Sequence, residues 1–535
     1  MQSVTLALMA PFLIGLVASA LLEAGLRPRP APFHRRSPAS VAVHIGSWCL
    51  LFALFTLVLQ RPWFALVFVL SLTLVVVQSS NTKSSTLKEP FICHDFEYFW
   101  DAILHPRLYV PFFGIGLAVA ASSAGALAIG GFFYFEPSLA GRFGAAYIGP
   151  LAGCAALGAL LVAVGLGKSP RATFEPAADL HRLGLFTSLW RYGVALYRST
   201  PPKASDSPFE PLTAQAPTPG ARLQATPLPH VVLVQSESFF DPRPWCDDIP
   251  QSALAHFDET RAQAVQKGAL EVPAWGANTV RTECAVLTGL APGAWGARQF
   301  NPYHTLARQG LPSLASAFQA RGYRTVCVHP YNARFYKRDR VMPNLGFETF
   351  IDIDDFPAEL RHGQYTSDLA VARKVGRLLE DDDNRPLFVF VITMENHGPL
   401  HLEAPDQASA SALLPSAHWP LPRHLRDLAV YLKHLGEADR MIDALKRSLT
   451  GASRPGLLAF YGDHVPILPE AYAHYGDPDG QTPYMIWSTE SEDHGEATPE
   501  ALKAQTLGVA LFNRALGGEP HGEWIKAAPE PQEQE

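Results

Sequence analysis

The chain has 535 residues, of which 48% are hydrophobic and 17% are charged, against about 25% charged residues in a typical soluble protein. The charge is unevenly spread, since 15 of the first 167 residues are charged and 78 of the remaining 368. This composition excludes disordered, collagen-like and coiled-coil classes. A net charge of −7 without basic clusters in the charged part argues against a nucleic-acid partner. Six cysteines are too few for a disulfide framework.

The apolar first third predicts a membrane domain. A helix needs about 20 apolar residues to cross a bilayer, and five stretches approach or exceed that length: Val4–Leu22, Val41–Leu59, Trp63–Gln78, Leu108–Phe135 and Gly144–Leu166. The first lacks a basic start and runs into Glu23 without a clear cleavage site, so we expect a retained helix rather than a signal peptide. We therefore expect residues 1–167 to form a transmembrane domain with five helices.

The arginines between the first two stretches conflict with one of the two possible orientations. Arg27, Arg29, Arg35 and Arg36 lie in this loop, and the positive-inside rule places such a loop in the cytoplasm. Five crossings would then leave the C-terminal body in the cytoplasm as well. An N-terminus inside the cell puts that body outside but leaves the arginine loop against the rule. Charge alone leaves both orientations open.

The segment after the fifth stretch predicts a connection between membrane and body. Ala177–Arg198 mixes large apolar residues with Arg, His and Asp, which predicts an amphipathic helix on the membrane surface. Thr200–Pro229 is rich in Pro, Ala and Ser and predicts a linker. We therefore expect an interfacial helix and linker over 168–228, a catalytic domain over 229–516 and a disordered tail over 517–535.

The body alternates short apolar runs with helix-like segments. Four runs are dense in β-branched and aromatic residues: His230–Gln235, Thr325–His329, Leu387–Thr393 and Leu457–Tyr461. Helical patterns such as Leu311–Arg321 and Ser367–Leu379 fall between them. This alternation predicts an α/β domain with a largely parallel sheet covered on both faces.

Polar residues follow three of the predicted strands almost at once. Glu237 follows the first, Asn396-His397 the third and Asp463-His464 the fourth. Functional sites of open α/β sheets collect outside the carboxyl ends of strands, so we expect these side chains to converge. Glu237, Asp463 and His464 make a mixed oxygen and nitrogen set that suits Mn²⁺ or Zn²⁺. An Asp-His pair alone also serves as a turn or a cap.

A hydroxyl at a predicted helix start is the candidate nucleophile. In WGANTVRTECAVLTGL, a turn of small residues precedes Thr279 and a helix-like segment follows it. Backbone N–H groups and the helix dipole favour an anion at this position. The hydroxyl is too weak an acid to react unaided, so a metal ion would have to activate it. The alternative is that Thr279 only caps the helix.

These motifs together resemble the lipoteichoic acid synthase and phosphoglycerol transferase family, whose members are membrane proteins of the alkaline phosphatase/sulfatase superfamily. Glu237 in VQSES resembles the family's first metal ligand, and Asp463-His464 in YGDH resemble its last two. Thr279 in NTVRTE resembles the metal-bound nucleophile, four residues before Glu283. The resemblance implies five transmembrane helices followed by an α/β sulfatase-like domain, and covers nearly the whole chain.

The resemblance also implies a substrate pocket. HPYNARFYKRD is similar to the family's headgroup-binding segment and carries His329, Tyr336 and Arg338 across to it, while His397 in MENHGP is similar to a histidine near the transferred phosphate. The chain departs from the family at Cys284, where an aromatic residue is common, and at Tyr336, where the Gram-positive synthases have Trp. Both departures concern the acceptor and headgroup.

The activity implied is transfer of phosphoglycerol from phosphatidylglycerol to an extracytoplasmic glycan or polymer hydroxyl, through a covalent intermediate on Thr279. The implied cofactor is one divalent cation, held by Glu237, Thr279, Asp463 and His464, with Mn²⁺ preferred over Zn²⁺ or Mg²⁺. Because the family transfers lipid headgroups outside the cytoplasmic membrane, the resemblance favours a bacterial inner-membrane protein with its catalytic domain in the periplasm.

Three alternatives remain beside this activity. Phosphoethanolamine transferases share the architecture but usually carry several disulfides, whereas only Cys246, Cys284 and Cys327 lie in the catalytic domain. A hydrolase of the same superfamily, either a phosphodiesterase or a sulfatase, is the second alternative. A sulfatase would need a C/S-x-P-x-R context, which is absent near Thr279. A non-enzymatic membrane binding protein would not need the whole set of candidate ligands and nucleophile.

Overall fold

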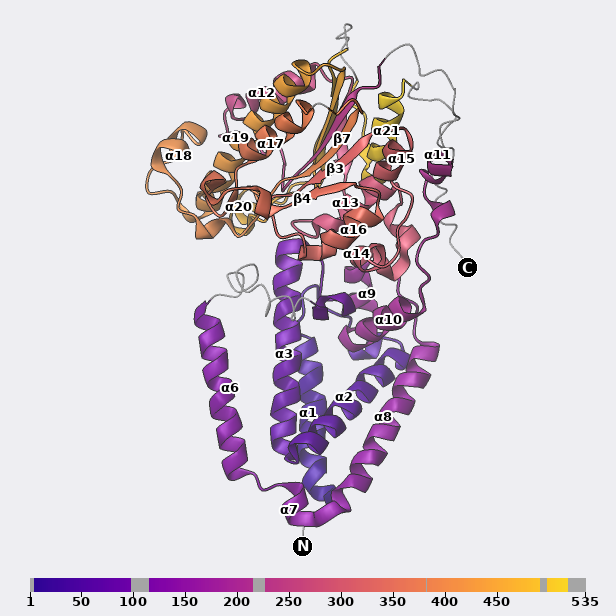
Figure 1. Ribbon diagram of the computed structural model, residues 1–535. Helices are drawn as coiled ribbons and strands as arrows, with labels where there is room; N and C mark the ends of the chain where they lie inside the picture. Colours follow the sequence, from indigo (N-terminus) through magenta and orange to yellow (C-terminus); the bar gives the residue numbers. More distant parts are fainter. Residues whose placement is uncertain (1–3, 98–114, 215–226, 382, 491–497, 518–535) are drawn as a thin grey trace. The chain divides into compact units, whose positions relative to one another are not determined.

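The computed structural model describes residues 4–97, 115–214, 227–381, 383–490 and 498–517. The chain divides into two compact units, Met1–Ser199 and Thr200–Glu535, each of which is described by itself (Figure 1). Parts of three predictions lie outside the described residues: 108–114 of the fourth apolar stretch, 215–226 of the linker and 518–535 of the tail. The domain boundaries expected from the sequence stay predictions.

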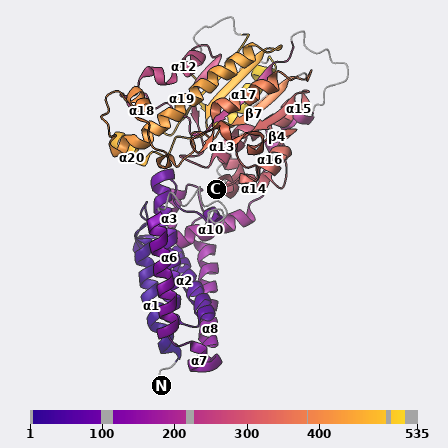
Figure 2. The same cartoon turned by 60° about the vertical axis from the view of Figure 1, so that its left-hand side comes forward.

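The first unit is built from long apolar helices: α1 (Val4–Glu23), α2 (Pro38–Leu59), α3 (Pro62–Leu87), α6 (Ile115–Phe135) and α8 (Ile148–Lys168). Figures 1 and 2 show α1, α2, α3 and α8 side by side. By length and composition, four stretches of the described residues could cross a membrane, and the fourth, Gly125–Lys168, takes in both α8 and much of α6. The number of crossings expected from the sequence stays a prediction.

Glycines allow α2 and α8 to pack closely. A Cβ added to Gly158 of α8 would lie 2.8 Å from the carbonyl oxygen of Gly46 on α2. One added to Gly165 would lie 2.8 Å from the carbonyl oxygen of Ala39. Small residues that bring two backbones together are typical of helix pairs in membranes, where tight packing replaces the hydrophobic effect between helices.

The start of α3 is fixed by Glu136, which follows α6. The Glu136 carboxylate accepts hydrogen bonds from the backbone N–H groups of Trp63 and Phe64, each 2.9 Å long. The first N–H groups of a helix have no partner within the helix, so this carboxylate satisfies two of them. The rings of Phe64 and Phe132 stack with centroids 5.2 Å apart, so the end of α6 is held against the start of α3.

The loop between α1 and α2 is folded around a buried carboxylate. Glu23 is fully buried and binds Arg36 Nη1 at 2.9 Å, while the N–H of Leu185 donates to its other oxygen at 2.5 Å. One of the four loop arginines is therefore paired inside the protein.

The predicted amphipathic helix over Ala177–Arg198 is wrong as a single helix. The structure has two, α9 (Pro176–Leu183) and α10 (Leu185–Arg198), separated by Gly184 at a φ of 78°. A Cβ at Gly184 would lie 2.1 Å from Arg36 Nη1 and 2.6 Å from a Glu23 oxygen. The helix breaks there because only glycine combines this backbone conformation with the space that the Glu23–Arg36 pair leaves.

The second unit contains an eight-stranded sheet. Its strands are β1 (His230–Ser236), β2 (Gln266–Glu271), β3 (Arg324–Val328), β4 (Thr349–Ile351), β7 (Leu387–Ile392), β8 (Gly456–Gly462), β9 (Thr482–Ser488) and β10 (Leu502–Lys503). Their order is β10-β2-β9-β8-β1-β7-β3-β4, and β9 runs antiparallel to both of its neighbours. The four predicted strands are the contiguous parallel centre β8-β1-β7-β3, which confirms the predicted α/β fold. A separate hairpin pairs β5 (Arg361–His362) with β6 (Tyr365–Thr366).

Helices cover both faces of this sheet (Figures 1 and 2). Val232 and Val234 of β1 pack in one core with α12 (Ala255–Ala262), α17 (Asp368–Leu379) and α19 (Arg423–Thr450). Val231 and Leu233 pack in the other core with α13 (Thr279–Thr288), α15 (Leu314–Ala320) and α21 (Ala504–Ala515). Every residue of β1 is buried, as expected for a parallel strand covered on both sides.

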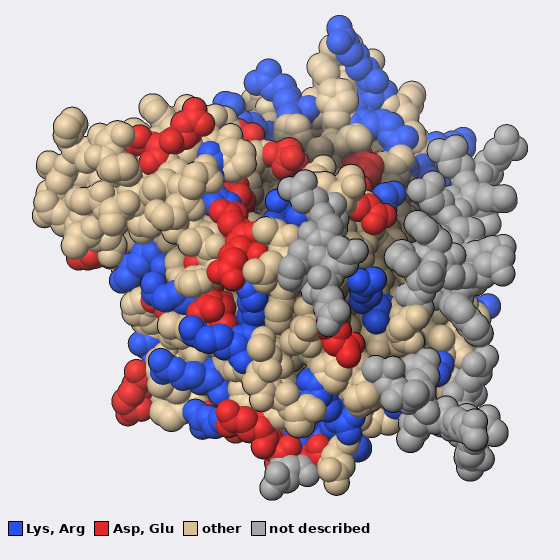
Figure 3. Space-filling view, turned by 90° about the horizontal axis from the view of Figure 1, so that it is seen from above, with Lys and Arg blue, Asp and Glu red and all other residues tan. Residues whose placement is uncertain are grey.

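Part of the predicted linker belongs to this second core. Phe209 is fully buried, and its ring lies 6.4 Å from that of Phe512 on α21. The short helix α11 (Glu210–Ala214) follows it. Over the described residues on the face in Figure 3, basic and acidic side chains are largely interspersed rather than gathered into one field.

Candidate active site

The carboxyl ends of β1 and β8 bring the three predicted ligands together. The two strands are parallel neighbours, and Ser236 lies opposite Gly462, so the residues that follow them emerge side by side. Glu237 is 3% exposed, Asp463 0% and His464 2%. One ligand atom from each lies within 4.8 Å of the other two. The residues that sequence analysis selected as a metal set therefore form one buried cluster, although their role as ligands stays a prediction.

Short contacts orient the cluster. His464 Nε2 lies 3.2 Å from Asp463 Oδ2 and 3.5 Å from Glu237 Oε1. His464 Nδ1 lies 3.0 Å from the carbonyl oxygen of Val465, to which it can donate, and this leaves Nε2 to face the carboxylates. Ser238 donates its N–H to Asp463 Oδ1 at 2.8 Å and its hydroxyl to Glu237 Oε1 at 2.9 Å.

The charges of the cluster fit a divalent cation. Burial and the nearby charge of Glu237 raise the pKa of Asp463 to about 7. Burial lowers the pKa of His464, but the charges of Asp463 and Glu237 outweigh it and the pKa is raised. Asp463 Oδ2 has no hydrogen-bond partner among the described residues. Two buried carboxylates with one imidazole are a donor set that Mn²⁺ and Zn²⁺ accept, and a cation would offset their charge.

Thr279 joins this cluster through α13. The residue before it, Asn278, occupies the N-cap with a φ of 66°, so Thr279 is the first helical residue rather than the cap. A hydrogen bond from the Thr279 side chain is among the effects that lower the pKa of Asp463. Thr282, one turn along α13, donates its hydroxyl to the carbonyl oxygen of Asp463 at 2.9 Å. Thr282 therefore links the start of α13 to Asp463, whose carboxylate belongs to the cluster.

The predicted headgroup residues His329 and Arg338 contact each other, and Arg338 also pairs with Glu283, to which sequence analysis gave no role. Arg338 begins α16 (Arg338–Asn344) and donates Nε to Glu283 Oε2 at 3.2 Å and Nη2 to Glu283 Oε1. Its third nitrogen, Nη1, lies 3.2 Å from His329 Nε2. Tyr303 donates its hydroxyl to Glu283 Oε2 at 2.6 Å. The Arg338 guanidinium, which was expected to hold phosphate oxygens, therefore makes two of its hydrogen bonds to Glu283.

His329 is held neutral by this arrangement. Burial and the positive charge of Arg338 lower its pKa well below the usual value. Its Nδ1 lies 3.2 Å from the carbonyl oxygen of Ile392, to which it can donate, so Nε2 faces Arg338 as an acceptor. The signal for Glu283 in the sequence is a charged residue four positions after Thr279 and directly before the apolar residues Cys284–Leu287, because a charged residue that is buried beside such residues needs a partner.

The remaining predicted residues, Tyr336 and His397, lie at the edges of the group formed by Glu283, Arg338 and His329. Tyr336 is half-buried with a φ of 54°, and the Arg338 guanidinium lies 5.3 Å from its ring centroid. His397 is half-buried, and its Nδ1 lies 2.6 Å from the carbonyl oxygen of Gly398 and 3.3 Å from the hydroxyl of Tyr365. Its charge contributes to the lowered pKa of His329. Burial raises the pKa of Tyr365, which sequence analysis did not select, and the charge of Glu237 adds to this effect.

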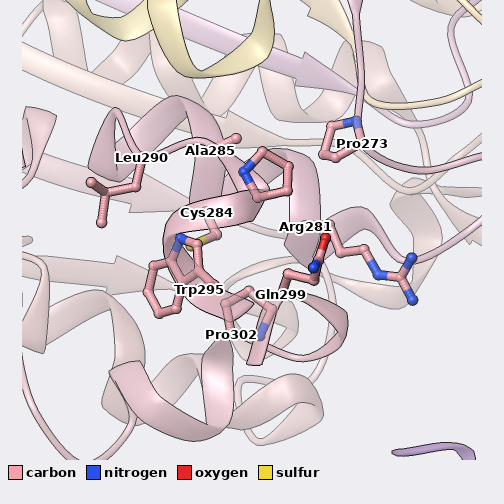
Figure 4. A pocket seen from close by; sticks show the side chains of 9 residues that line it. Pro273, Arg281, Cys284, Ala285, Leu290, Trp295, Gln299 and Pro302 are labelled. Atoms are coloured by element: carbon pink, nitrogen blue, oxygen red, sulfur yellow. The ribbon is translucent and has the colours of Figure 1, made fainter. Parts of the chain in front are cut away.

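A small pocket lies on another side of α13 (Figure 4). Its lining includes Arg281, Cys284, Leu290 and Trp295 but none of the predicted site residues. Figure 4 shows the Cys284 thiol beside the Trp295 indole, and both residues are buried. Cys284 therefore packs in the core rather than among the candidate catalytic residues.

The chain is similar to known proteins over part of its length. The chain is 33% identical over 264 residues to the capsular polysaccharide biosynthesis protein RkpI of Rhizobium meliloti, which is 48% of this chain and 45% of that protein. It is 27% identical over 305 residues to another protein of that bacterium named for cyclic β-1,2-glucan modification, which is 53% and 46% of the two chains. The chain thus spans about half the length of the curated relatives it matches.

Solved structures with a similar fold include the Streptococcus pyogenes phosphoglycerol transferase GacH in complex with sn-glycerol-1-phosphate. That match has 22% identity, covers 58% of this chain and 79% of that one, and has a TM-score of 0.44. The lipoteichoic acid synthase LtaP of Listeria monocytogenes matches with 21% identity, 60% and 80% coverage and a TM-score of 0.44. The Sulfatase family model matches residues 229–509, which is more than half of the chain and includes every candidate site residue described above. The chain belongs to the sulfatase family.

Proposed function

We propose that this chain transfers phosphoglycerol from phosphatidylglycerol to a hydroxyl of an extracytoplasmic glycan or polymer, through a covalent intermediate on Thr279. The observation that carries the proposal is the placement of Thr279 at the start of α13, where its side chain helps to lower the pKa of Asp463 in the buried Glu237–Asp463–His464 cluster and Thr282 of the same helix binds the Asp463 carbonyl. A nucleophile, an anion-stabilising helix start and a candidate cation site thus meet at one place.

Glu237, Asp463 and His464 would hold one divalent cation, with Mn²⁺ as our choice and the Thr279 oxygen as a further ligand. When bound, the cation supplies the positive charge that lets the Thr279 hydroxyl lose its proton to solvent and that offsets charge on the phosphoryl oxygens. The backbone N–H of Ser238 binds the Asp463 carboxylate and the hydroxyl of Thr282 binds the Asp463 carbonyl, so the site is preorganised before substrate binds.

In the first half-reaction, Thr279 Oγ1 attacks the headgroup phosphorus and the bond to diacylglycerol breaks. His397 donates a proton to the leaving diacylglycerol oxygen, since it is half-buried and the Tyr365 hydroxyl and the Gly398 carbonyl orient its ring. His329 and Tyr336 would line the headgroup pocket. Arg338 holds His329 and Glu283 in place and stabilises phosphoryl charge from its remaining N–H groups.

In the second half-reaction, an acceptor hydroxyl attacks the phosphoglyceryl-threonine. Neutral His397 takes the proton of that hydroxyl, and the Thr279 oxygen leaves. Because donor and acceptor use one site in turn, ping-pong kinetics are expected. The names of the two Rhizobium relatives support a polysaccharide or glucan acceptor.

The choice of phosphoglycerol over phosphoethanolamine is supported by the cysteines. All six are free thiols, and Cys246, Cys284 and Cys327 in the second unit are buried singly. The disulfides usual in phosphoethanolamine transferases are therefore not formed in this chain.

The test is to incubate the purified full chain with Mn²⁺ and phosphatidylglycerol labelled in the headgroup, in the presence of membrane glycans from the source cells. We expect release of unlabelled diacylglycerol and recovery of the label in a glycan fraction. A parallel reaction with headgroup-labelled phosphatidylethanolamine should give no labelled glycan. Transfer from phosphatidylethanolamine alone would contradict the donor, and release of labelled glycerol phosphate with no labelled glycan would indicate a hydrolase.

A further inference from the structure

A second group of buried acidic and imidazole side chains lies apart from the Glu237–Asp463–His464 cluster. His362 of β5, Glu395 after β7 and Glu437 of α19 each offer one ligand atom, and these atoms lie within 4.8 Å of one another. His362 Nδ1 is 2.7 Å from Glu395 Oε1 and 3.5 Å from Glu437 Oε1. Glu395 is fully buried, whereas the His362 side chain is 37% exposed, so the group can be reached from solvent through the histidine.

Two further buried groups beside this cluster have polar atoms without partners. Asp368 is 1% exposed and its N–H donates to Glu395 Oε2 at 2.7 Å, but its own Oδ1 has no hydrogen-bond partner among the described residues. His434 lies one turn before Glu437 on α19, is 2% exposed, and its Nδ1 is likewise without a partner in the described chain. The rings of His362 and His434 have centroids 6.4 Å apart. Buried polar atoms are normally satisfied, so an unpartnered oxygen of Asp368, which adjoins Glu395, and an unpartnered nitrogen of His434, whose ring neighbours His362, support a ligand at this group.

The negative charge of the group is poorly balanced. Burial and the charge of Glu437 raise the pKa of Glu395 to about 8, and burial with the charges of Glu395 and Glu437 raises the pKa of Asp368 well above its usual value. The guanidinium that contacts Glu437 belongs to Arg440, which is 53% exposed and approaches from the solvent side. A cation between the carboxylates would relieve a repulsion that this one arginine does not.

We propose that His362, Glu395 and Glu437 form a second divalent-cation site, separate from the Glu237–Asp463–His464 cluster, for a transition metal ion such as Zn²⁺ or Mn²⁺. Two carboxylates and one imidazole suit such ions better than Ca²⁺ or Mg²⁺, which favour oxygen-only shells. His362 binds the ion through the lone pair of Nδ1, and the neutral ring then carries its proton on Nε2. Asp368 adjoins the shell through the hydrogen bond from its N–H to Glu395, and His434 Nε2 is engaged with Glu403 Oε2 at 3.1 Å.

The site joins three parts of the chain that are distant in sequence. His362 comes from the β5–β6 hairpin, Glu437 from the middle of α19, and Glu395 from the turn after β7. Glu395 precedes His397 by two residues, so a bound ion would tie the turn that carries His397 to α19. The proposal does not depend on the reaction catalysed, because it concerns only the residues of this second group.

The test is the number of cations bound per chain, measured by elemental analysis of the full chain after removal of metal with a chelator and reloading with Zn²⁺ or Mn²⁺ alone. We expect two ions per wild-type chain, one in Glu437→Gln, one in His362→Ala and one in Asp463→Asn. The Asp463→Asn/Glu437→Gln double variant should bind none. Glu259→Gln is the matched control, since Glu259 is an exposed glutamate that contacts α19 through Lys446, and it should keep both ions.

If the wild type binds one ion, and Asp463→Asn loses that ion while Glu437→Gln keeps it, the proposal of a second site is overturned. This result would hold whatever the variants do to stability. Retention of two ions in both His362→Ala and Glu437→Gln would place the second ion elsewhere and would equally contradict the proposal. Reloading of Asp463→Asn isolates the second site: a fold intact by size-exclusion chromatography that takes up no ion would also overturn it.

Discussion

Arg338 and Glu283, 55 residues apart in the sequence, form a doubly hydrogen-bonded ion pair whose side chains are 2% and 0% exposed. The pair links α13, which begins with Thr279, to α16, and Arg338 in turn holds His329. Glu283 therefore fixes the predicted headgroup-binding residues Arg338 and His329 relative to the nucleophile candidate Thr279. Breaking such a pair by removing one partner leaves a buried charge without compensation.

Arg338→Met should destabilise the second unit by about 3 to 5 kcal/mol, because Glu283 is left buried and unpaired. The Arg338→Met/Glu283→Leu double variant should recover part of this loss while remaining inactive in transfer. Urea unfolding of the full chain, followed by tryptophan fluorescence, measures the effect. Arg385→Met is the control: this arginine is 46% exposed, so it should cost less than about 1 kcal/mol. A double variant less stable than the single variant would contradict the explanation.

His397→Ala should reduce transfer by about 10²- to 10⁴-fold, the range usual for loss of a general acid or base. The metal content and the unfolding temperature should stay at wild-type values, because His397 makes no contact with the Glu237–Asp463–His464 cluster in the described structure. His401→Ala, an exposed histidine four residues further on, is the matched control and should be fully active. Equal activity of both variants would remove His397 from the reaction.

A topology reporter fused after Glu535 should be active only outside the cytoplasm. Arg36 is buried in an ion pair with Glu23, which leaves three of the four loop arginines to influence the orientation. The positive-inside rule therefore opposes this orientation less strongly than four free arginines would. A fusion with a reporter that is active only in the cytoplasm is the complementary measurement. Activity of that second fusion would place the catalytic domain inside and deprive the proposed reaction of its acceptor.

His230 should make the second unit sensitive to mild acid. It is 5% exposed at the start of β1, its Nδ1 accepts the N–H of Leu387 at 3.0 Å, and burial with the charges of Arg454 and Arg324 lowers its pKa to about 4. Below its unfolded pKa of about 6.5, the unfolded chain binds a proton that the folded chain does not. Stability should therefore fall as the pH falls from about 6.5 to 4, by up to about 3 kcal/mol.

His230→Asn keeps a hydrogen-bond acceptor but cannot take up a proton. Its unfolding temperature should thus fall less than that of the wild type between about pH 7 and pH 5, where only the imidazole contributes to the difference between the two chains. Parallel losses in wild type and variant would show that His230 does not carry the acid sensitivity.

Much of the fold could be predicted because local pattern and tertiary structure agree. The four central strands are apolar runs that are buried on both faces, and their carboxyl ends place Glu237 beside Asp463 by register alone. Four strands outside the parallel centre, β2, β4, β9 and β10, were not predicted. Gln266–Glu271 is mostly polar or small, and β4 and β10 are very short. Their pairing is decided by neighbours distant in sequence.

The parts of the site that sequence analysis missed depend on contacts between distant segments. Glu283 is visible in α13, but its partner Arg338 lies beyond β3, and nothing local indicates that the two meet. The break at Gly184 likewise depends on Glu23 and Arg36 rather than on the helical pattern around it. His362 and Glu437 carry no recognisable spacing and come together only through the packing of the β5–β6 hairpin near α19.

The central claim is that Thr279 carries the phosphoglyceryl group during turnover. The direct measurement is mass spectrometry of peptides from the full chain, quenched in acid during reaction with phosphatidylglycerol and Mn²⁺. We expect a phosphoglyceryl adduct on Thr279 in the wild type, a matching adduct on the serine of Thr279→Ser, and neither adduct nor transfer in Thr279→Ala with its fold and membrane insertion intact. Full transfer by Thr279→Ala would contradict the account and would favour direct attack on the phosphodiester by water or by the acceptor.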